Sequence, residues 1–205
     1  MMLKHARSFF SRLFTPVARL LLRVGLTPNA VTVIGTLGVS GGALILYPLG
    51  ELFWGTVVIT LFVFSDLVDG LMARLGGQSS VLGGFLDSVL DRVQDSAVFL
   101  GLMMWFYTTG ENAMIGSAAA ICMVLGLLVS YIRARAESMG FDANVGIAER
   151  PERMVSTLVT AGLVGLGLHE GVLHVVLVLL AIASGITVAQ RITTVAQQAN
   201  EPRAY

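Results

Sequence analysis

The sequence predicts an all-α integral membrane protein, with six transmembrane helices and an N-terminal amphipathic helix on the membrane surface. Composition is the first reason, because 55% of the 205 residues are hydrophobic and only 13% are charged, with a mean hydropathy of +0.80. Soluble domains carry about 25% charged residues. The second reason is that the charge-free stretches at residues 29–50, 112–132 and 171–190 are each long enough to cross a bilayer as a helix.

The first expected element is the N-terminal segment, residues 1–25. Its apolar residues recur at helical spacing and basic residues interrupt them, which predicts a helix that lies on the membrane and does not cross it. Pro16 predicts a new helical segment beginning there, because proline suits a first turn and disrupts a helix interior. The apolar positions are Phe9, Phe10, Leu13, Val17, Leu20, Leu21 and Val24, and the basic ones are Lys4, Arg7, Arg12, Arg19 and Arg23.

Six membrane helices are expected to make up one domain over residues 26–205. Three of them reach spanning length only by extending into charged residues, because their charge-free parts, at 52–65, 96–110 and 154–169, are shorter than about 20 residues. The longest connection is expected at residues 139–152. The six helices are expected near residues 29–49, 52–75, 83–108, 112–138, 153–169 and 171–197.

Basic residues predict the orientation of these helices. In the six-helix arrangement all 13 lysines and arginines fall on one side, whereas the opposite turns carry only Glu51, Glu111 and Glu170. Lysine and arginine accumulate on the cytoplasmic side of short loops. Both termini and the active site are therefore expected at the cytoplasmic face of the inner membrane. The basic side is expected to contact anionic lipid headgroups, and no nucleic-acid partner is expected from a net charge of zero.

Four aspartates lie in the extensions of the second and third helices. Asp66 and Asp69 are three residues apart and Asp87 and Asp91 are four apart, so each pair shares one helical face. The two helices run antiparallel about a loop at residues 75–82, which places Asp66 and Asp91 about 12–14 Å from that end. An aspartate facing lipid costs roughly 2.5–3.5 kcal/mol at a helix centre. The four carboxylates are therefore expected to converge inside the protein.

Such a cluster needs cations, and an all-oxygen ligand set suits Mg²⁺ or Mn²⁺ at one or two sites. The alternatives are a proton relay, as in a cation or proton-coupled transporter, and structural ion pairs with Arg74 and Arg92. Gly70 and Gly83 favour a bulky ligand beside the metal, because glycine lets the backbone approach it. Arg74 also offers a guanidinium suited to phosphate oxygens. Asp95 continues the face of the third helix and is expected to form interhelical hydrogen bonds, with Arg92 as a separate anchor.

The segment from Asp66 to Asp91 resembles the signature of the CDP-alcohol phosphotransferase family, DxxDGxxARx8GxxxDxxxD, without departure. The resemblance extends to residues 26–32 and to the six-helix plan. It implies a homodimeric enzyme that moves a substituted phosphate from a CDP-linked donor to an alcohol and releases CMP. The fixed positions in this chain are Asp66, Asp69, Gly70, Ala73, Arg74, Gly83, Asp87 and Asp91.

The same resemblance implies roles for particular residues. Two divalent ions per subunit would be held by Asp66, Asp69, Asp87 and Asp91, with Asp91 also the candidate base for the attacking hydroxyl. The residues implied to contact the CDP moiety are Asn29, Thr32, Asp69, Gly70, Ala73, Arg74 and Gly83.

Four arginines near the same membrane face are the candidates for binding the acceptor: Arg133, Arg135, Arg153 and Arg191. Spacing alone fits either a phosphate pocket or separate membrane anchors. Residues 130–137 and 148–153 resemble the actinobacterial phosphatidylinositol-phosphate synthases of this family, which implies that these arginines hold an acceptor phosphate. The expected reaction is transfer of a phosphatidyl group from CDP-diacylglycerol to inositol 1-phosphate. Glycerol 3-phosphate is the alternative acceptor, and a transporter is the alternative from another class.

Overall fold

The structure is a computed structural model, and it describes residues 2–77 and 80–200, with side chains described from residue 13 onward. These ranges contain helices joined by turns and loops and no β-strand, which confirms the all-α prediction. The elements are α1 (Met2–Arg23), α2 (Pro28–Gly41), the π-helix η1 (Gly42–Leu46), α3 (Leu52–Val63), α4 (Ser65–Leu75), α5 (Val81–Tyr107), α6 (Ala113–Ser138), α7 (Arg150–Gly165) and α8 (Glu170–Asn200).

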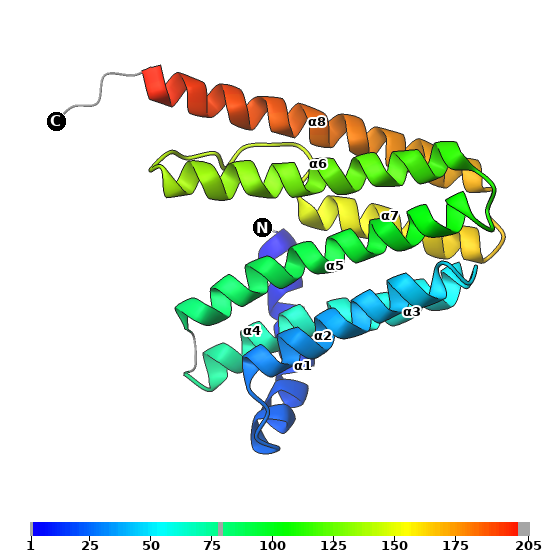
Figure 1. Cartoon of the computed structure of the whole chain (residues 1–205). Helices are drawn as coiled ribbons and strands as arrows, with labels where there is room; N and C mark the ends of the chain where they lie inside the picture. Colours follow the sequence, from blue (N-terminus) through cyan, green and yellow to red (C-terminus); the bar gives the residue numbers. More distant parts are fainter. Residues whose placement is uncertain (1, 78–79, 201–205) are drawn as a thin grey trace.

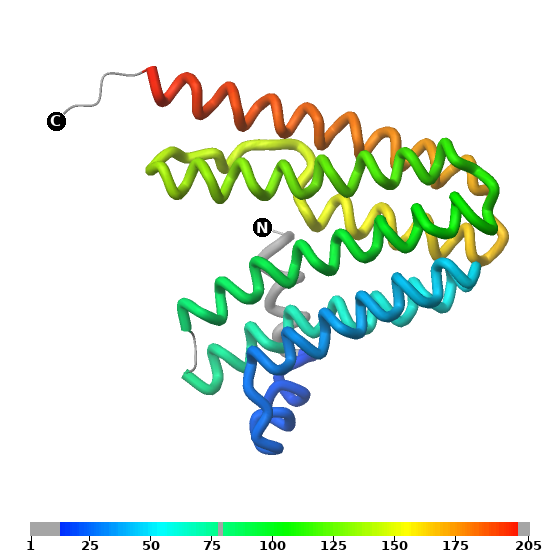
Figure 2. Tube along the Cα trace, in the orientation of Figure 1, coloured from blue at the N-terminus to red at the C-terminus, as the bar shows by residue number. Residues whose placement is uncertain are grey.

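From α2 onward the chain passes back and forth along one direction, whereas α1 lies steeply across that direction (Figure 1). The α2–η1 segment runs in one direction and α3 and α4 run in the opposite direction. Helices α5, α6, α7 and α8 then run in alternating directions, as the Cα trace also shows (Figure 2). The end of α4, the start of α5, the loop at residues 139–149 and the end of α8 therefore lie at one end of the bundle. The predicted site residues come from this end.

Four segments of the described chain are long and apolar enough to cross a membrane, namely Pro28–Leu46, Leu52–Leu75, Ala113–Ser138 and Glu170–Asn200. The protein is therefore a multi-pass membrane protein. Helix α5 falls outside this set because it carries Asp87, Asp91, Arg92 and Asp95, and α7 because it has only 16 residues. Passage of α5 and α7 through the bilayer remains a prediction.

The second expected helix, at residues 52–75, is divided at Phe64 into α3 and α4. The Phe64 ring stacks on Phe14 of α1, with centroids 5.5 Å apart. Directly after this break α4 approaches α2 so closely that a Cβ on Gly35 would lie 1.8 Å from Ser65 Oγ. The break therefore lets α4 turn its aspartates toward α2.

Helix α7 begins at Arg150, three residues before the expected start at Arg153. The backbone N–H of Glu149 donates to Glu152 Oε2 at 3.1 Å in a capping box, and Pro151 suits the first turn. The earlier start places Arg150 and Arg153 three residues apart on one helix face.

Helix α1 is continuous through Pro16, so the predicted new segment there is wrong. Tertiary packing explains the continuity, because Ala18 is fully buried against α2 and α4 and Leu21 and Leu22 pack beside it. A different face of the helix leaves apolar side chains exposed, at Leu13, Val17, Leu20 and Val24. Some residues used in the sequence predictions have side chains that the structure does not describe. They are Phe9, Phe10, Lys4, Arg7, Arg12 and Arg203.

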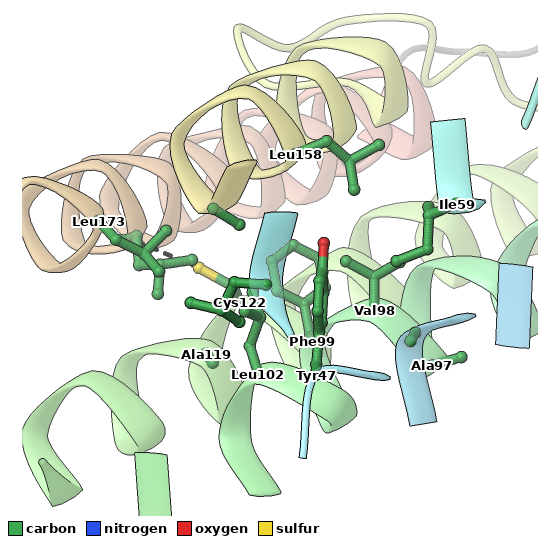
Figure 3. Packing of buried hydrophobic residues seen from close by; sticks show 14 of the residues in the cluster. Tyr47, Ile59, Ala97, Val98, Phe99, Leu102, Ala119, Cys122, Leu158 and Leu173 are labelled. Atoms are coloured by element: carbon green, nitrogen blue, oxygen red, sulfur yellow. Dashed lines mark hydrogen bonds between the residues drawn. The ribbon is translucent and has the colours of Figure 1, made fainter. Parts of the chain in front are cut away.

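The main hydrophobic core lies where η1, α3, α5, α6, α7 and α8 meet, and includes Tyr47, Phe99, Leu102 and Leu173 (Figure 3). Here α5 crosses η1 backbone to backbone, because a Cβ on Gly101 would lie 2.2 Å from the Ala43 carbonyl oxygen. This close crossing sets the position of α5, and therefore of its aspartates, relative to α2.

Candidate active site

A cavity of about 290 Å³ opens between the N-terminal turns of α2 and α5 and the inner face of α4. Every residue predicted to bind metal or CDP lines this cavity except Arg74 and Asp91. The predicted residues that line it together are Asn29, Thr32, Asp66, Asp69, Gly70, Ala73, Gly83 and Asp87. Arg74 is exposed beside the cavity, with its Nη1 atom 3.9 Å from where a Cβ on Gly70 would stand.

Two capped helix starts border the cavity. Thr27 Oγ1 accepts a hydrogen bond from the backbone N–H of Ala30 at 3.2 Å, and Ser80 Oγ accepts one from Gly83 at 2.9 Å. Free backbone N–H groups and the helix dipole make such helix starts favourable for anions. Between them, Thr32 Oγ1 donates to the carboxylate of Asp69 at 2.5 Å. The cavity therefore combines carboxylates suited to cations with helix starts suited to phosphate.

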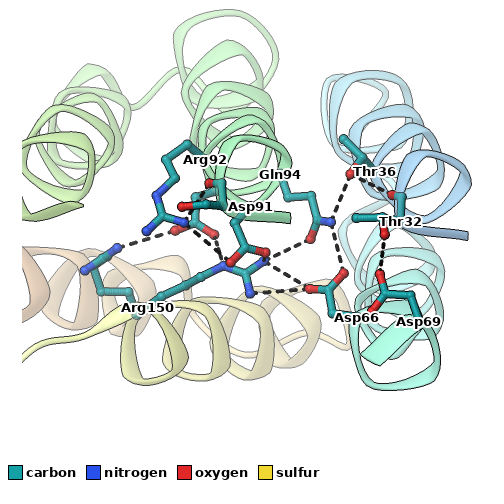
Figure 4. A network of polar contacts seen from close by, with 11 residues as sticks. Thr32, Thr36, Asp66, Asp69, Asp91, Arg92, Gln94 and Arg150 are labelled. Carbon is teal, nitrogen blue, oxygen red and sulfur yellow. Dashed lines mark hydrogen bonds and ion pairs between the residues drawn. The ribbon is translucent and has the colours of Figure 1, made fainter. Parts of the chain in front are cut away.

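Arg150, at the first turn of α7, lies in the middle of the acidic cluster (Figure 4). Its Nη2 atom is 3.0 Å from Asp91 Oδ1 and 3.4 Å from Asp66 Oδ2. Its Nε atom donates to Asp95 Oδ1 at 2.9 Å. The sequence predictions gave Arg150 no role in the site. The capping box around Glu149 was the signal that would have placed it on one face with Arg153.

Gln94 joins this cluster to α2 and is completely buried. Its amide nitrogen donates to Thr36 Oγ1 at 3.1 Å and to Asp66 Oδ1 at 3.3 Å. Its amide oxygen accepts from Arg150 Nη2 at 3.0 Å. A buried polar chain thus runs across α2, α5, α4 and α7, as the dashed lines in Figure 4 show.

Convergence of all four carboxylates is only partly observed. Asp66, Asp69 and Asp87 line the cavity, whereas Asp91 faces Arg150 and, at 3.5 Å, Arg92. In the described part of the chain no three His, Cys, Asp or Glu side chains stand close enough together to hold a metal ion. Ion pairing explains the difference, because the Arg150 guanidinium lies between Asp66 and Asp91 as an internal cation.

The donor set nevertheless fits a hard divalent cation, since all four side chains are carboxylates at one end of two neighbouring helices. The position of Arg150 between Asp66 and Asp91 also shows that these carboxylates require a positive charge to neutralise them. Asp95 forms interhelical hydrogen bonds as expected, but its partners are Arg150 and Arg153. Arg92 instead pairs with Asp91.

A second, smaller cavity of about 100 Å³ lies beside the acidic cluster and is called here the arginine pocket. Three of the four predicted acceptor residues, Arg133, Arg153 and Arg191, line it, so the structure brings them together. Arg135 does not, because its side chain is exposed and donates to Ser138 at 3.4 Å. A role for Arg135 in binding the acceptor stays a prediction. Arg92 and Arg150, which were not predicted for this role, complete the pocket.

The two inner arginines of the pocket also hold the fold together. Arg191 donates to the backbone carbonyls of Val129 at 2.6 Å and Val145 at 2.8 Å. Arg153 is 1% exposed and donates to the Ala148 carbonyl at 3.2 Å. Its buried Nε atom has no hydrogen-bond partner among the described residues. Glu149 is the only carboxylate among the described residues that line the pocket, and its arginines also pair outside it with Asp66, Asp91, Asp95 and Glu137. An anion in the pocket would therefore compete with these carboxylates for the guanidinium groups.

Carboxylates suited to divalent cations beside helix starts suited to phosphate are the features expected of a membrane phosphotransferase. The sequence model of the CDP-alcohol phosphatidyltransferase family matches residues 25–189 of this chain. The chain belongs to this family.

Within this family, the chain is similar to enzymes named phosphatidylinositol phosphate synthase. The chain is 47% identical to the phosphatidylinositol phosphate synthase of Streptomyces avermitilis, over 98% of this chain and 85% of the relative. It is 44% identical to that of Mycolicibacterium smegmatis, over 92% of this chain and 86% of the relative.

Solved structures agree in fold. The crystal structure of Mycobacterium tuberculosis phosphatidylinositol phosphate synthase with CDP-DAG bound superposes with a TM-score of 0.88 at 42% identity, covering 95% of this chain and all of that one. The same enzyme in complex with manganese and citrate gives a TM-score of 0.87, with 93% of each chain covered.

Proposed function

We propose that this chain transfers the phosphatidyl group of CDP-diacylglycerol to the hydroxyl of inositol 1-phosphate, yielding phosphatidylinositol phosphate and CMP. The observation that carries the proposal is the adjacency of two cavities: one lined by carboxylates and helix starts, the other by arginines, with Arg150 contacting both sets. A nucleotide diphosphate fits the first by chemistry, and the phosphate of a phosphorylated alcohol fits the second. The relatives named as phosphatidylinositol phosphate synthases support inositol phosphate as the acceptor.

In this proposal Asp66, Asp69, Asp87 and Asp91 hold two ions of Mg²⁺ or Mn²⁺ per subunit. Bound metal would neutralise the donor diphosphate and make its phosphorus more electrophilic. The manganese complex of the Mycobacterium tuberculosis enzyme supports Mn²⁺ as a suitable ion.

Asp91 is the proposed base. Its carboxylate contacts Arg92 and Arg150, and both of these also line the arginine pocket. An acceptor held there by its phosphate would present a hydroxyl toward Asp91. Asp91 would take the hydroxyl proton as the new P–O bond forms and the bond from phosphorus to the CMP oxygen breaks. Arg133, Arg153 and Arg191, together with Arg150, would orient the acceptor.

The donor is proposed to bind between α2, α4 and α5. Asn29, Thr32, Asp69, Gly83 and Ala73 would border the cytidine diphosphate, with its negative charge at the two helix starts. Gly70 would allow close approach of the diphosphate, and Arg74 would contact it from the exposed side.

The placement in the membrane is also proposed. Helices α5 and α7 would complete six spans over residues 26–205, with both termini and the two cavities at the cytoplasmic face of the inner membrane. Residues 1–25 would lie on the membrane surface and contact lipids. The exposed apolar side chains Leu13, Val17, Leu20 and Val24 support this placement, since they form a ridge facing away from the protein. Homodimerisation is proposed from family resemblance.

The proposal is tested with purified full-length protein, radiolabelled CDP-diacylglycerol and Mn²⁺. Release of CMP is expected only when inositol 1-phosphate is added. Release that requires glycerol 3-phosphate instead would make the chain a phosphatidylglycerophosphate synthase. No release with either alcohol would overturn the transferase proposal and favour a cation or proton-coupled transporter.

The cavity proposed to bind CDP-diacylglycerol is called here the donor cavity, and Gly70 lies in its wall. We expect Gly70→Ala to weaken donor binding without lowering stability. Among the described residues, a Cβ at this position would meet only the far end of the Arg74 side chain, at 3.9 Å. Stability is therefore expected to be unchanged or raised by about 0.5–1 kcal/mol, since alanine favours helix over glycine. The donor KM is expected to rise by about tenfold, a change of roughly 1.4 kcal/mol, if the diphosphate contacts the backbone here.

The measurement pairs thermal unfolding with the KM of each substrate. Ala73→Gly, which removes a methyl group from the same cavity wall, is the matched comparison and is expected to lower stability without crowding the donor. An unchanged donor KM in Gly70→Ala would place the diphosphate elsewhere.

A further inference from the structure

The guanidinium of Arg150 lies between the two sites that the proposed reaction uses. Its Nη2 atom pairs with Asp91 at 3.0 Å and with Asp66 at 3.4 Å, which are two of the proposed metal ligands. The same residue lines the arginine pocket proposed for the acceptor. Its Nε atom is 2.9 Å from Asp95, which is not a proposed ligand. Arg150 is therefore held by Asp95 at its Nε atom, and its terminal Nη2 atom forms ion pairs with two carboxylates that are proposed to bind metal.

A divalent ion on Asp66 and Asp91 would compete with this terminal nitrogen. Both cations would use oxygens of the same carboxylates, and like charges so close together repel in a partly buried site. The side chain of Arg150 is 24% exposed, and those of Asp66 and Asp91 are 16% and 17% exposed, so water screens the repulsion only in part. Metal binding would therefore displace the terminal nitrogen of Arg150.

The anchor at Asp95 limits where the displaced group can go. Asp95 also pairs with Arg153 Nη2 at 3.4 Å, and Arg153 lies in the arginine pocket. With Nε still on Asp95, the planar guanidinium would have to pivot as a whole about that contact, and this motion would keep it within reach of the pocket. Gln94 contacts both partners, since its amide nitrogen donates to Asp66 Oδ1 and its amide oxygen accepts from Arg150 Nη2. The displacement would break the second contact and leave the hydrogen bond to Asp66 in place.

We propose that Arg150 couples metal binding to acceptor binding. It neutralises Asp66 and Asp91 in the metal-free protein and, once displaced by the metal, offers its terminal nitrogens to the phosphate of the acceptor. This inference rests on the proposed function. It makes the acceptor site complete only when the metal site is loaded. Because coupling between two sites is reciprocal, the acceptor also tightens metal binding by the same factor.

The test measures binding without turnover. Calorimetry is performed on full-length protein in detergent, with Mn²⁺ and inositol 1-phosphate as probes and no CDP-diacylglycerol. Saturating Mn²⁺ is expected to lower the Kd of inositol 1-phosphate for the wild-type protein by about tenfold, within the usual range of coupling between sites. Arg150→Gln is expected to bind Mn²⁺ about tenfold more tightly. Its affinity for inositol 1-phosphate is expected to be independent of Mn²⁺.

Two comparison variants separate coupling from other effects. Arg19→Gln removes an exposed charge from α1 and is expected to behave as the wild type. Arg150→Lys keeps the charge and is expected to restore the wild-type affinity for Mn²⁺. Because Mn²⁺ and phosphate monoesters associate in solution, the coupling is taken as the difference between the wild type and Arg150→Gln. A merely structural role would weaken both ligands alike and leave the effect of Mn²⁺ intact.

A second measurement uses only the wild-type protein, and so does not depend on the folding of a variant. In a structure determined with Mn²⁺, Arg150 Nη2 is expected to lie beyond 4.0 Å from Asp66 and Asp91, the ion-pair limit. An intact pair with Asp91 beside bound Mn²⁺ overturns the inference. So does an acceptor Kd that Mn²⁺ leaves unchanged, although the proposed function would then stand. Failure of the wild type to bind Mn²⁺ at all would instead refute the proposed metal site.

Discussion

Asp87→Asn is expected to abolish metal-dependent release of CMP, with a loss of at least about 10³-fold, or roughly 4 kcal/mol of transition-state stabilisation. Among the four aspartates, substitution of Asp87 gives the clearest test of the metal site. It lines the donor cavity, and no ion pair ties it to an arginine in the described part of the chain. The substitution therefore removes a charged metal ligand without leaving a buried guanidinium unpaired.

The measurement compares turnover with direct binding of Mn²⁺ by calorimetry, and both are expected to fall while thermal unfolding is unchanged. Asp142→Asn is the matched control, because Asp142 lies in the exposed loop between α6 and α7 and its side chain accepts only a local bond from Asn144 in the contacts observed. Wild-type turnover in Asp87→Asn would remove this residue from the metal site.

Arg191→Ala is expected to have the second largest effect, on both acceptor binding and stability. The KM for inositol 1-phosphate is expected to rise at least about tenfold, with a smaller change in the donor KM. The free energy of unfolding is expected to fall by roughly 2–5 kcal/mol, because the carbonyls of Val129 and Val145 lose charged hydrogen-bond donors. Loss of the Val145 contact would also loosen the loop that leads into α7.

Steady-state kinetics with each substrate varied in turn, together with thermal unfolding, checks this expectation. Arg135→Ala provides the comparison, because Arg135 is exposed and outside the arginine pocket. Its substitution is expected to change either KM by less than about twofold, as for other surface changes. Equal rises in both KM values for Arg191→Ala would reduce Arg191 to a structural residue, and a large acceptor effect of Arg135→Ala would restore the expectation from sequence.

Much of the donor cavity was predictable from sequence because its determinants are local. The spacings of Asp66 and Asp69, and of Gly83 and Asp87, place each pair on one helix face. A short loop then brings the two faces together at one end of the bundle. These relations depend on helix geometry and loop length, so they survive errors of a few residues in the helix boundaries.

The environment of Asp91 was not predictable in the same way. Asp91 has the spacing of a metal ligand, yet in the structure it faces Arg150 from α7. Arg150 also reaches Asp66, which is 84 positions away in the chain. Such a contact depends on where three helices cross, and no periodicity within one helix reports it. The early start of α7, produced by its capping box, moved Arg150 into range.

The sequence by itself determined the membrane class, the order of the helices, the family and the aspartate pairs, because hydropathy, helical period and signature spacing are properties of contiguous chain. Only the tertiary structure decided which arginines share a pocket, leaving out Arg135 and adding Arg92 and Arg150. The physical reason is that charge alone attracts all arginines to the same membrane face, whereas helix packing selects which of them are buried together.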